Sequence, residues 1–118
     1  MSPERHPSGF QNFIKAQVFA VIRATYGFEK DALAEIKGTK ATEARGVAAY
    51  LFQESGIPKS TVGELLKRTP NGIEGSLREI GKTMKNDENF RGKVSELGER
   101  IDIIRLRRNF VKMRPDLI

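Results

Sequence analysis

The feature that most constrains the fold is a pair of proline-containing breaks within an otherwise helical stretch, residues 43–84. The first break is GIPK at residues 56–59, and the second is TPNG at residues 69–72. Proline lacks the amide hydrogen that a helix interior needs, and it pushes the preceding residue out of helical geometry. The stretch is therefore expected to contain three successive helices, at 43–55, at 61–68 and at 74–84.

Capping signals predict where these helices begin. Thr42 is suited to cap the first of them, with Glu43 in the first turn, where the helix dipole favours an acid. Thr61 and Glu64 have the spacing of a capping box, so the short helix is expected to begin there. Asn71-Gly72 is a turn signal between the second and third helices. The pattern indicates a helix-turn-helix, whose second helix enters the major groove of DNA.

The segments on both sides of this stretch also have helical patterns. Apolar residues predict one helix from Phe10 to about Tyr26, closed by Gly27, and a short helix at 29–36. Asn86 or Asp87 is expected to cap a last helix. The prediction is an all-α fold of about six helices around a central helix-turn-helix, without strands.

One domain is expected over residues 10–105, between a disordered lead-in at 1–9 and a basic C-terminal tail at 106–118. In the last helix, apolar residues recur four and three positions apart from Phe90 to Ile104, which makes a short heptad seam. This seam either packs inside the chain or joins two copies in a homodimer.

Charge and residue types narrow the function. The formal net charge of +6 and the pI of about 9.8 favour a polyanionic partner such as nucleic acid. The chain has no cysteine, and His6 is its only histidine, so we expect no catalytic residues, no metal and no cofactor. No apolar run is long enough to cross a membrane and no secretory signal is visible, which predicts a cytoplasmic, nucleoid-associated protein.

A resemblance to a known family rests on four groups of residues. They are Ala44-Arg45 with VAAYL at 47–51, Thr61 with Glu64-Leu65, Ile14 with Val18 and Tyr26, and the segment from Asp87 to Ile101. In these residues the chain resembles the C-terminal DNA-binding domain of the bacterial replication initiator DnaA, and the related domain appended to transposases of the repetitive-extragenic-palindrome type. The resemblance implies a Trp-repressor-like, all-helical domain that binds double-stranded DNA through its helix-turn-helix.

The chain departs from this family where the initiator reads bases. The initiator carries the signature GRDHTT there, whereas this chain has NGIEGS at residues 71–76, in which only Ser76 could stand for a threonine. A different target sequence is therefore expected. The chain also lacks a GxxxxGK[ST] motif, so the initiator's ATPase activity is not expected.

In a helix-turn-helix, the first turns of the second helix reach base edges, and the flanking residues bind phosphates. The residues expected to read bases are Asn71, Glu74, Ser76 and Arg78. Phosphate contacts are expected from Lys59, Ser60, Thr61, Lys67, Arg68 and Lys82. In the initiator family a basic residue before the helix pair enters the minor groove; here Lys40 is the candidate, with Arg45 nearby.

These assignments have structural alternatives. Ser60 and Thr61 could serve only as helix caps, and Lys67 and Arg68 only as compensation for the dipole at a helix C-terminus. Two other functions also stay open. In the first alternative, the chain is the DNA-binding end of a transposase-type enzyme. In the second, it is a domain of this kind that has become a protein-interaction module.

Overall fold

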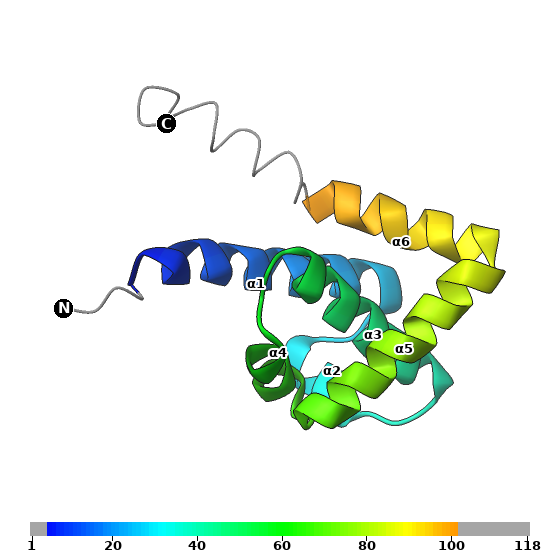
Figure 1. Ribbon diagram of the computed structural model, residues 1–118, viewed down its shortest axis with the longest axis horizontal. Helices are drawn as coiled ribbons and strands as arrows, with labels where there is room; N and C mark the ends of the chain where they lie inside the picture. The colour runs from blue at the N-terminus through cyan, green and yellow to red at the C-terminus, as the bar shows by residue number, and fades with distance from the viewer. Residues whose placement is uncertain (1–4, 102–118) are drawn as a thin grey trace.

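The fold consists of α-helices alone over the part of the chain that can be described (Figure 1). The computed structural model describes the backbone of residues 5–101 and the side chains of residues 12–101. The six helices in this range are α1 (Arg5–Tyr26), α2 (Lys30–Glu35), α3 (Thr39–Glu54), α4 (Lys59–Leu66), α5 (Pro70–Asn86) and α6 (Glu88–Ile101). The prediction of an all-α fold with about six helices is therefore confirmed. The tail predicted at 106–118 lies outside the described residues.

The core is organised around α3, which packs against α1, α2, α4 and α5. Its inward positions are occupied by small residues, among them Ala44, Ala48 and Ala49, which are fully buried. At Gly46 an added Cβ would lie 2.5 Å from Cγ1 of Ile80, so α5 approaches the backbone of α3 closely. This close packing fixes which face of α5 is buried and which face is left to solvent.

The last helix, α6, runs alongside α1 (Figure 1). Asp87 caps it as predicted, because its Oδ1 accepts a hydrogen bond from the amide of Phe90 at 3.1 Å. The seam residues Phe90, Val94, Leu97 and Ile101 are buried within their own chain, as the packing interpretation predicts; Ile104 lies outside the described residues. A homodimer through the last helix stays a prediction, and it would need residues other than these four.

A cluster of polar contacts at the edge of the core joins α1 and α6 to α3. The hydroxyl of Tyr26 donates a hydrogen bond to Oε2 of Glu43 at 2.6 Å, and Nζ of Lys93 lies 3.5 Å from the same oxygen. The Lys93 ammonium also lies 4.6 Å from the centroid of the Tyr26 ring. Burial and, after it, the neighbouring carboxylate raise the pKa of Tyr26 well above its ordinary value. Glu43 is thus satisfied by contacts that hold the fold together.

Two helices in the first half of the chain begin earlier than predicted. Helix α1 begins at Arg5 instead of Phe10, so part of the predicted lead-in is helical. Pro7 is compatible with this start because its missing N–H falls in the first turn, where no helical acceptor exists. Helix α3 begins directly after Gly38, which has a φ of 121° that glycine tolerates, and Thr42 is not its N-cap. The Thr42 hydroxyl lies inside the first turn and donates to the Gly38 carbonyl at 2.9 Å.

Helix α4 also begins ahead of its predicted start, at Lys59 instead of Thr61. Pro58 provides the extended residue before the helix, with φ −65° and ψ 151°, and it has no hydroxyl to cap the first turn. The capping box predicted at Thr61 is therefore wrong, since Thr61 is already the third residue of the helix.

Helix α5 begins at Pro70 instead of Glu74. Thr69 is extended, as predicted from the proline that follows it, and its hydroxyl accepts a hydrogen bond from the amide of Gly72 at 3.0 Å. Pro70 then occupies the first helical position, where its fixed φ suits a helix. Asn71-Gly72 consequently lies in the first turn of α5, and the prediction of a turn between the two helices there is wrong.

Candidate nucleic-acid interface

Helices α4 and α5 are joined by the three residues Lys67, Arg68 and Thr69, and they pack against each other. Lys67 ends α4 in the left-handed conformation, with φ 56° and ψ 49°. The amide of Arg68 donates to the carbonyl of Gly63 at 2.8 Å, which closes a Schellman-type C-cap. Thr69 then caps α5. A connection of three residues between two packed helices is the arrangement of a helix-turn-helix.

Two arginines hold this turn and α3 against the C-terminal end of α2. Nη1 of Arg45 donates to the carbonyls of Leu33 at 2.9 Å and Ile36 at 2.7 Å. Nη1 of Arg68 donates to the carbonyl of Ala34 at 3.1 Å and also contacts the carbonyls that end α4. These carbonyls form the negative end of a helix dipole, where a cation is stabilising. Burial, with a smaller effect of Arg68, lowers the pKa of Arg45.

Arg45 and Arg68 were both predicted to contact DNA, and their hydrogen bonds within the protein bear on that prediction. The alternative interpretation of Arg68, compensation at a helix C-terminus, is confirmed by its bonds to α2 and α4. Arg45 has its guanidinium on backbone carbonyls in the same way. Both side chains therefore have a role in the fold, and their geometry adds no support for a contact with DNA.

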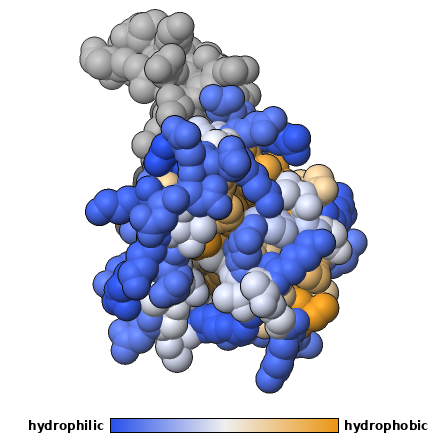
Figure 2. All heavy atoms as spheres, turned by 90° about the vertical axis from the view of Figure 1, so that its right-hand side faces the viewer, coloured by the Kyte–Doolittle hydropathy of each residue, from blue (hydrophilic) through white to orange (hydrophobic). Residues whose placement is uncertain are grey.

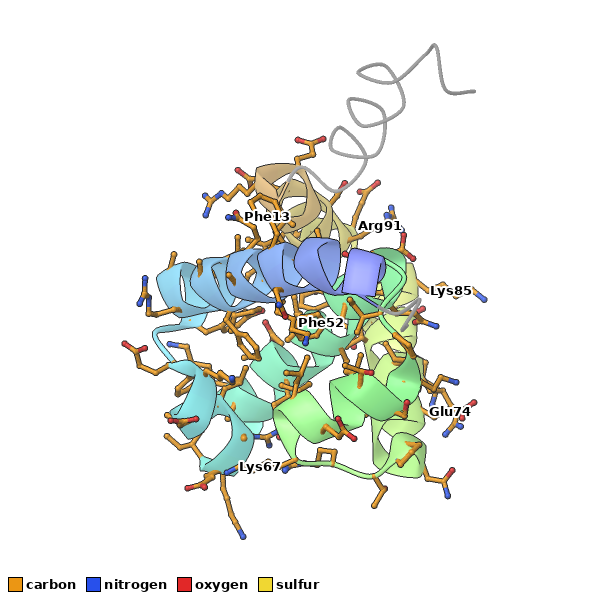
Figure 3. The ribbon with its side chains drawn as sticks, turned by 90° about the vertical axis from the view of Figure 1, so that its left-hand side faces the viewer. Phe13, Phe52, Lys67, Glu74, Lys85 and Arg91 are labelled. Atoms are coloured by element: carbon orange, nitrogen blue, oxygen red, sulfur yellow. The ribbon has the colours of Figure 1, made fainter. Side chains whose placement is uncertain are left out.

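The exposed face of α5 carries a line of polar and basic side chains. Opposite the buried Ile73 and Ile80, exposed residues recur three and four positions apart. They are Asn71, Glu74, Arg78, Lys82 and Lys85, which we call the α5 outer stripe. With 1.5 Å of rise per residue the stripe is about 20 Å long. Figure 3 shows Glu74 and Lys85 on the same edge of the molecule, both directed outward.

The surface around the second half of α5 is strongly polar. Figure 2 shows hydrophilic side chains over most of the face where α5 meets α6, with small apolar areas between them. Lys82 lies 4.0 Å from Glu79, which is off the stripe, while Arg78 and Lys85 have no ion-pair partner among residues 12–101. All three cations are exposed, and the one ion pair among them, that of Lys82, lies at the surface. An external anion can therefore reach each of them.

Glu74 is the acid of the outer stripe, and it is paired with the start of α4. Its Oε1 lies 3.4 Å from Nζ of Lys59, the first residue of α4, and both side chains are about half exposed. Ser60 and Thr61 follow in the first turn of α4, where the backbone amides have no acceptor within the helix. The N-terminus of α4 and the first turns of α5 are thus adjacent on the surface.

The remaining predicted residues lie outside this surface or at its border. Lys40 is exposed in the first turn of α3, and Lys67 is exposed and 3.2 Å from Glu35. Ser76 is half-buried on the flank of α5 that faces α3. It is two positions from Glu74, and residues two apart do not share a helix face. The structure therefore brings Asn71, Glu74 and Arg78 together and leaves Ser76 apart.

Lys85 belongs to the stripe but was not among the residues predicted from the sequence. It follows Lys82 by three positions and Arg78 by seven, so it continues the same helical face. The signal was present in the spacing. It was missed because the helix was expected to end at residue 84, whereas α5 continues to Asn86.

Comparison with known proteins found no match to a family profile, to a curated protein or to a solved structure. The resemblance to the initiator domain therefore stays a prediction. Within residues 5–101, no helix is long and apolar enough to cross a membrane. Among residues 12–101, whose side chains are described, no group of three or more acidic or histidine side chains could hold a metal ion.

Proposed function

We propose that this protein binds double-stranded DNA, with the α5 outer stripe in the major groove and the N-terminus of α4 on the phosphate backbone. The observation that carries the proposal is the stripe itself. It places Asn71 at the start of a helix, and three cations follow on the same exposed face. The major groove of B-DNA is about 12 Å wide and admits an α-helix.

The separation of the cations into two sets supports this proposal. Arg45 and Arg68 are held by backbone carbonyls and stabilise the fold, whereas Arg78 and Lys85 make no ion pair among residues 12–101. Arginine pairs bidentately with guanine and asparagine with adenine, so the stripe includes side chains that can read bases. An exposed cation alone is ordinary, but this set lies on the helix that the turn presents to solvent.

The N-terminus of α4 would supply the phosphate contacts. Lys59 offers an ammonium, and the free amides of the first turn point along the positive end of the helix dipole. The hydroxyls of Ser60 and Thr61 are not used as side-chain caps of α4. Lys40 and Lys67, both exposed, would extend the contact along the backbone. A DnaA-like domain acting on chromosomal DNA would be associated with the nucleoid.

Binding of a labelled duplex of about 20 base pairs at several salt concentrations tests the proposal. With about four phosphates neutralised, the logarithm of the binding constant should fall linearly with the logarithm of salt concentration, with a slope of about −3.6. Fluorescence anisotropy between 50 and 300 mM salt measures this slope. A protein that leaves the duplex free at 50 mM salt, or whose binding ignores salt, would contradict the proposal.

A further inference from the structure

We propose that Glu74 makes this surface selective for cytosine at one position of the DNA site; the inference rests on the proposed entry of α5 into the major groove. A carboxylate on a DNA-binding surface needs a reason, because it repels phosphates. Glu74 interrupts a stripe whose other charged members are Arg78, Lys82 and Lys85. Its position and its partner together provide that reason.

The position of Glu74 is that of a base-reading residue. Helix α5 starts at Pro70, four residues earlier than predicted, so Glu74 is in the second turn and not at the helix end. One turn before it on the same face is Asn71, and one turn after it is Arg78. In Figure 3 the Glu74 side chain projects from the edge of the molecule, away from the core. Side chains in the N-terminal turns of such a helix reach base edges.

Lys59 holds the carboxylate in place and leaves part of it available. Nζ of Lys59 lies 3.4 Å from Oε1 of Glu74, and no contact of Oε2 with another described residue is seen. The Lys59 ammonium offsets the negative charge next to the phosphates. Oε2 can therefore accept a hydrogen bond from a base without leaving the ion pair.

The chemistry of the groove makes this acceptor selective. Cytosine presents the N4 amino group as a donor in the major groove, and a carboxylate accepts from it. Guanine presents only the acceptors N7 and O6, and thymine presents the acceptor O4 and a methyl group, so both leave the carboxylate unpaired and facing oxygen or nitrogen lone pairs. Adenine presents the N6 amino group as a donor next to the acceptor N7. A carboxylate can accept from N6, but it has no hydrogen to donate to N7. Cytosine is the base that fits.

Selection of bound duplexes from a random pool tests the inference with three proteins besides the wild type. Glu74→Gln should move the preference at this one position from cytosine to adenine, because glutamine pairs bidentately with adenine. Glu74→Ala should lose the preference there, with discrimination falling by at least about fivefold. Preferences at the other positions should stay unchanged in both variants.

Glu79→Gln is the matched control. Glu79 lies on the same helix and is exposed, but off the outer stripe, and its replacement removes the same charge. It should raise affinity for all sequences by up to about fivefold and select the same sequence as the wild type. The inference is overturned if Glu74→Gln selects the wild-type sequence, or if the wild type binds duplexes without favouring cytosine at any position. A wild type that binds no duplex at all overturns the proposed function as well, so the two failures are distinguishable.

Discussion

Replacing Arg78, Lys82 and Lys85 together by glutamine should reduce the affinity for every duplex sequence by about a hundredfold or more near 100 mM salt. Each cation that neutralises a phosphate contributes about 0.9 to the slope of log affinity against log salt, so losing the phosphate contacts of Lys82 and Lys85 should make the slope flatter by about 1.8, and losing Arg78 removes a base contact in addition. All three side chains are exposed and make no contact with the core, so the fold should be unchanged. Anisotropy titrations of both proteins over the same salt range measure the difference.

A second triple variant separates this effect from a simple loss of net charge. Lys15 and Arg23 on α1 and Arg100 on α6 lie outside the helix-turn-helix. Their replacement by glutamine also removes three positive charges, so the net charge changes by the same amount. This control should lose less than about tenfold in affinity, since charges more than a Debye length from the DNA are largely screened. An equal loss in the two triple variants would show that the outer stripe is not the contact surface.

Gly63→Ala should destabilise the protein by about 3 kcal/mol. A Cβ at this position would lie 2.5 Å from the carbonyl oxygen of Arg68 and 3.6 Å from its carbonyl carbon. These are backbone atoms of the turn, and the same turn is closed by the bond from the Arg68 amide to the Gly63 carbonyl. Relief of the clash would have to move α5 relative to α4. For a domain of this size the melting temperature should fall by about 10–20 °C.

Gly92→Ala is the matched control for this prediction. Gly92 lies in the interior of α6, is exposed, and an added Cβ would meet nothing within 4 Å. Replacing an unstrained helical glycine by alanine should stabilise the protein by about 0.5–1 kcal/mol. Thermal unfolding followed by circular dichroism compares the two. If the melting temperatures of both variants lie above that of the wild type, the turn does not pack closely on Gly63 as described.

The order of helices and much of the core could be predicted from the sequence, because apolar spacing depends on local pattern alone. The seam from Phe90 to Ile101 and the effect of Pro70 on Thr69 are examples. The first residue of each helix was harder to predict from the sequence, because several neighbouring residues could serve as N-caps. Gly38 ends the preceding loop ahead of Thr42, so the helix is already formed where the threonine was expected to begin it.

The candidate site could be predicted only in part, for a different physical reason. Asn71, Glu74 and Arg78 share a face through their spacing along one helix, which the sequence contains. The role of Arg45 and Arg68 depends on where α2 lies in space, and no local pattern places the carbonyls of Leu33 and Ala34 beside them. Positive charge and position along the sequence therefore predicted DNA contacts for two arginines whose side chains hold the fold together.

The most direct test of the central claim is to locate the DNA on the protein. The sequence contains no cysteine, so a single introduced cysteine can carry a photoactivatable cross-linker at one chosen position. If α5 faces the DNA, Asn71→Cys, at the start of the outer stripe, should cross-link to a bound duplex, and Ala16→Cys, exposed on α1, should not. Cross-linking from position 16 with none from position 71 would contradict the claim that α5 faces the DNA.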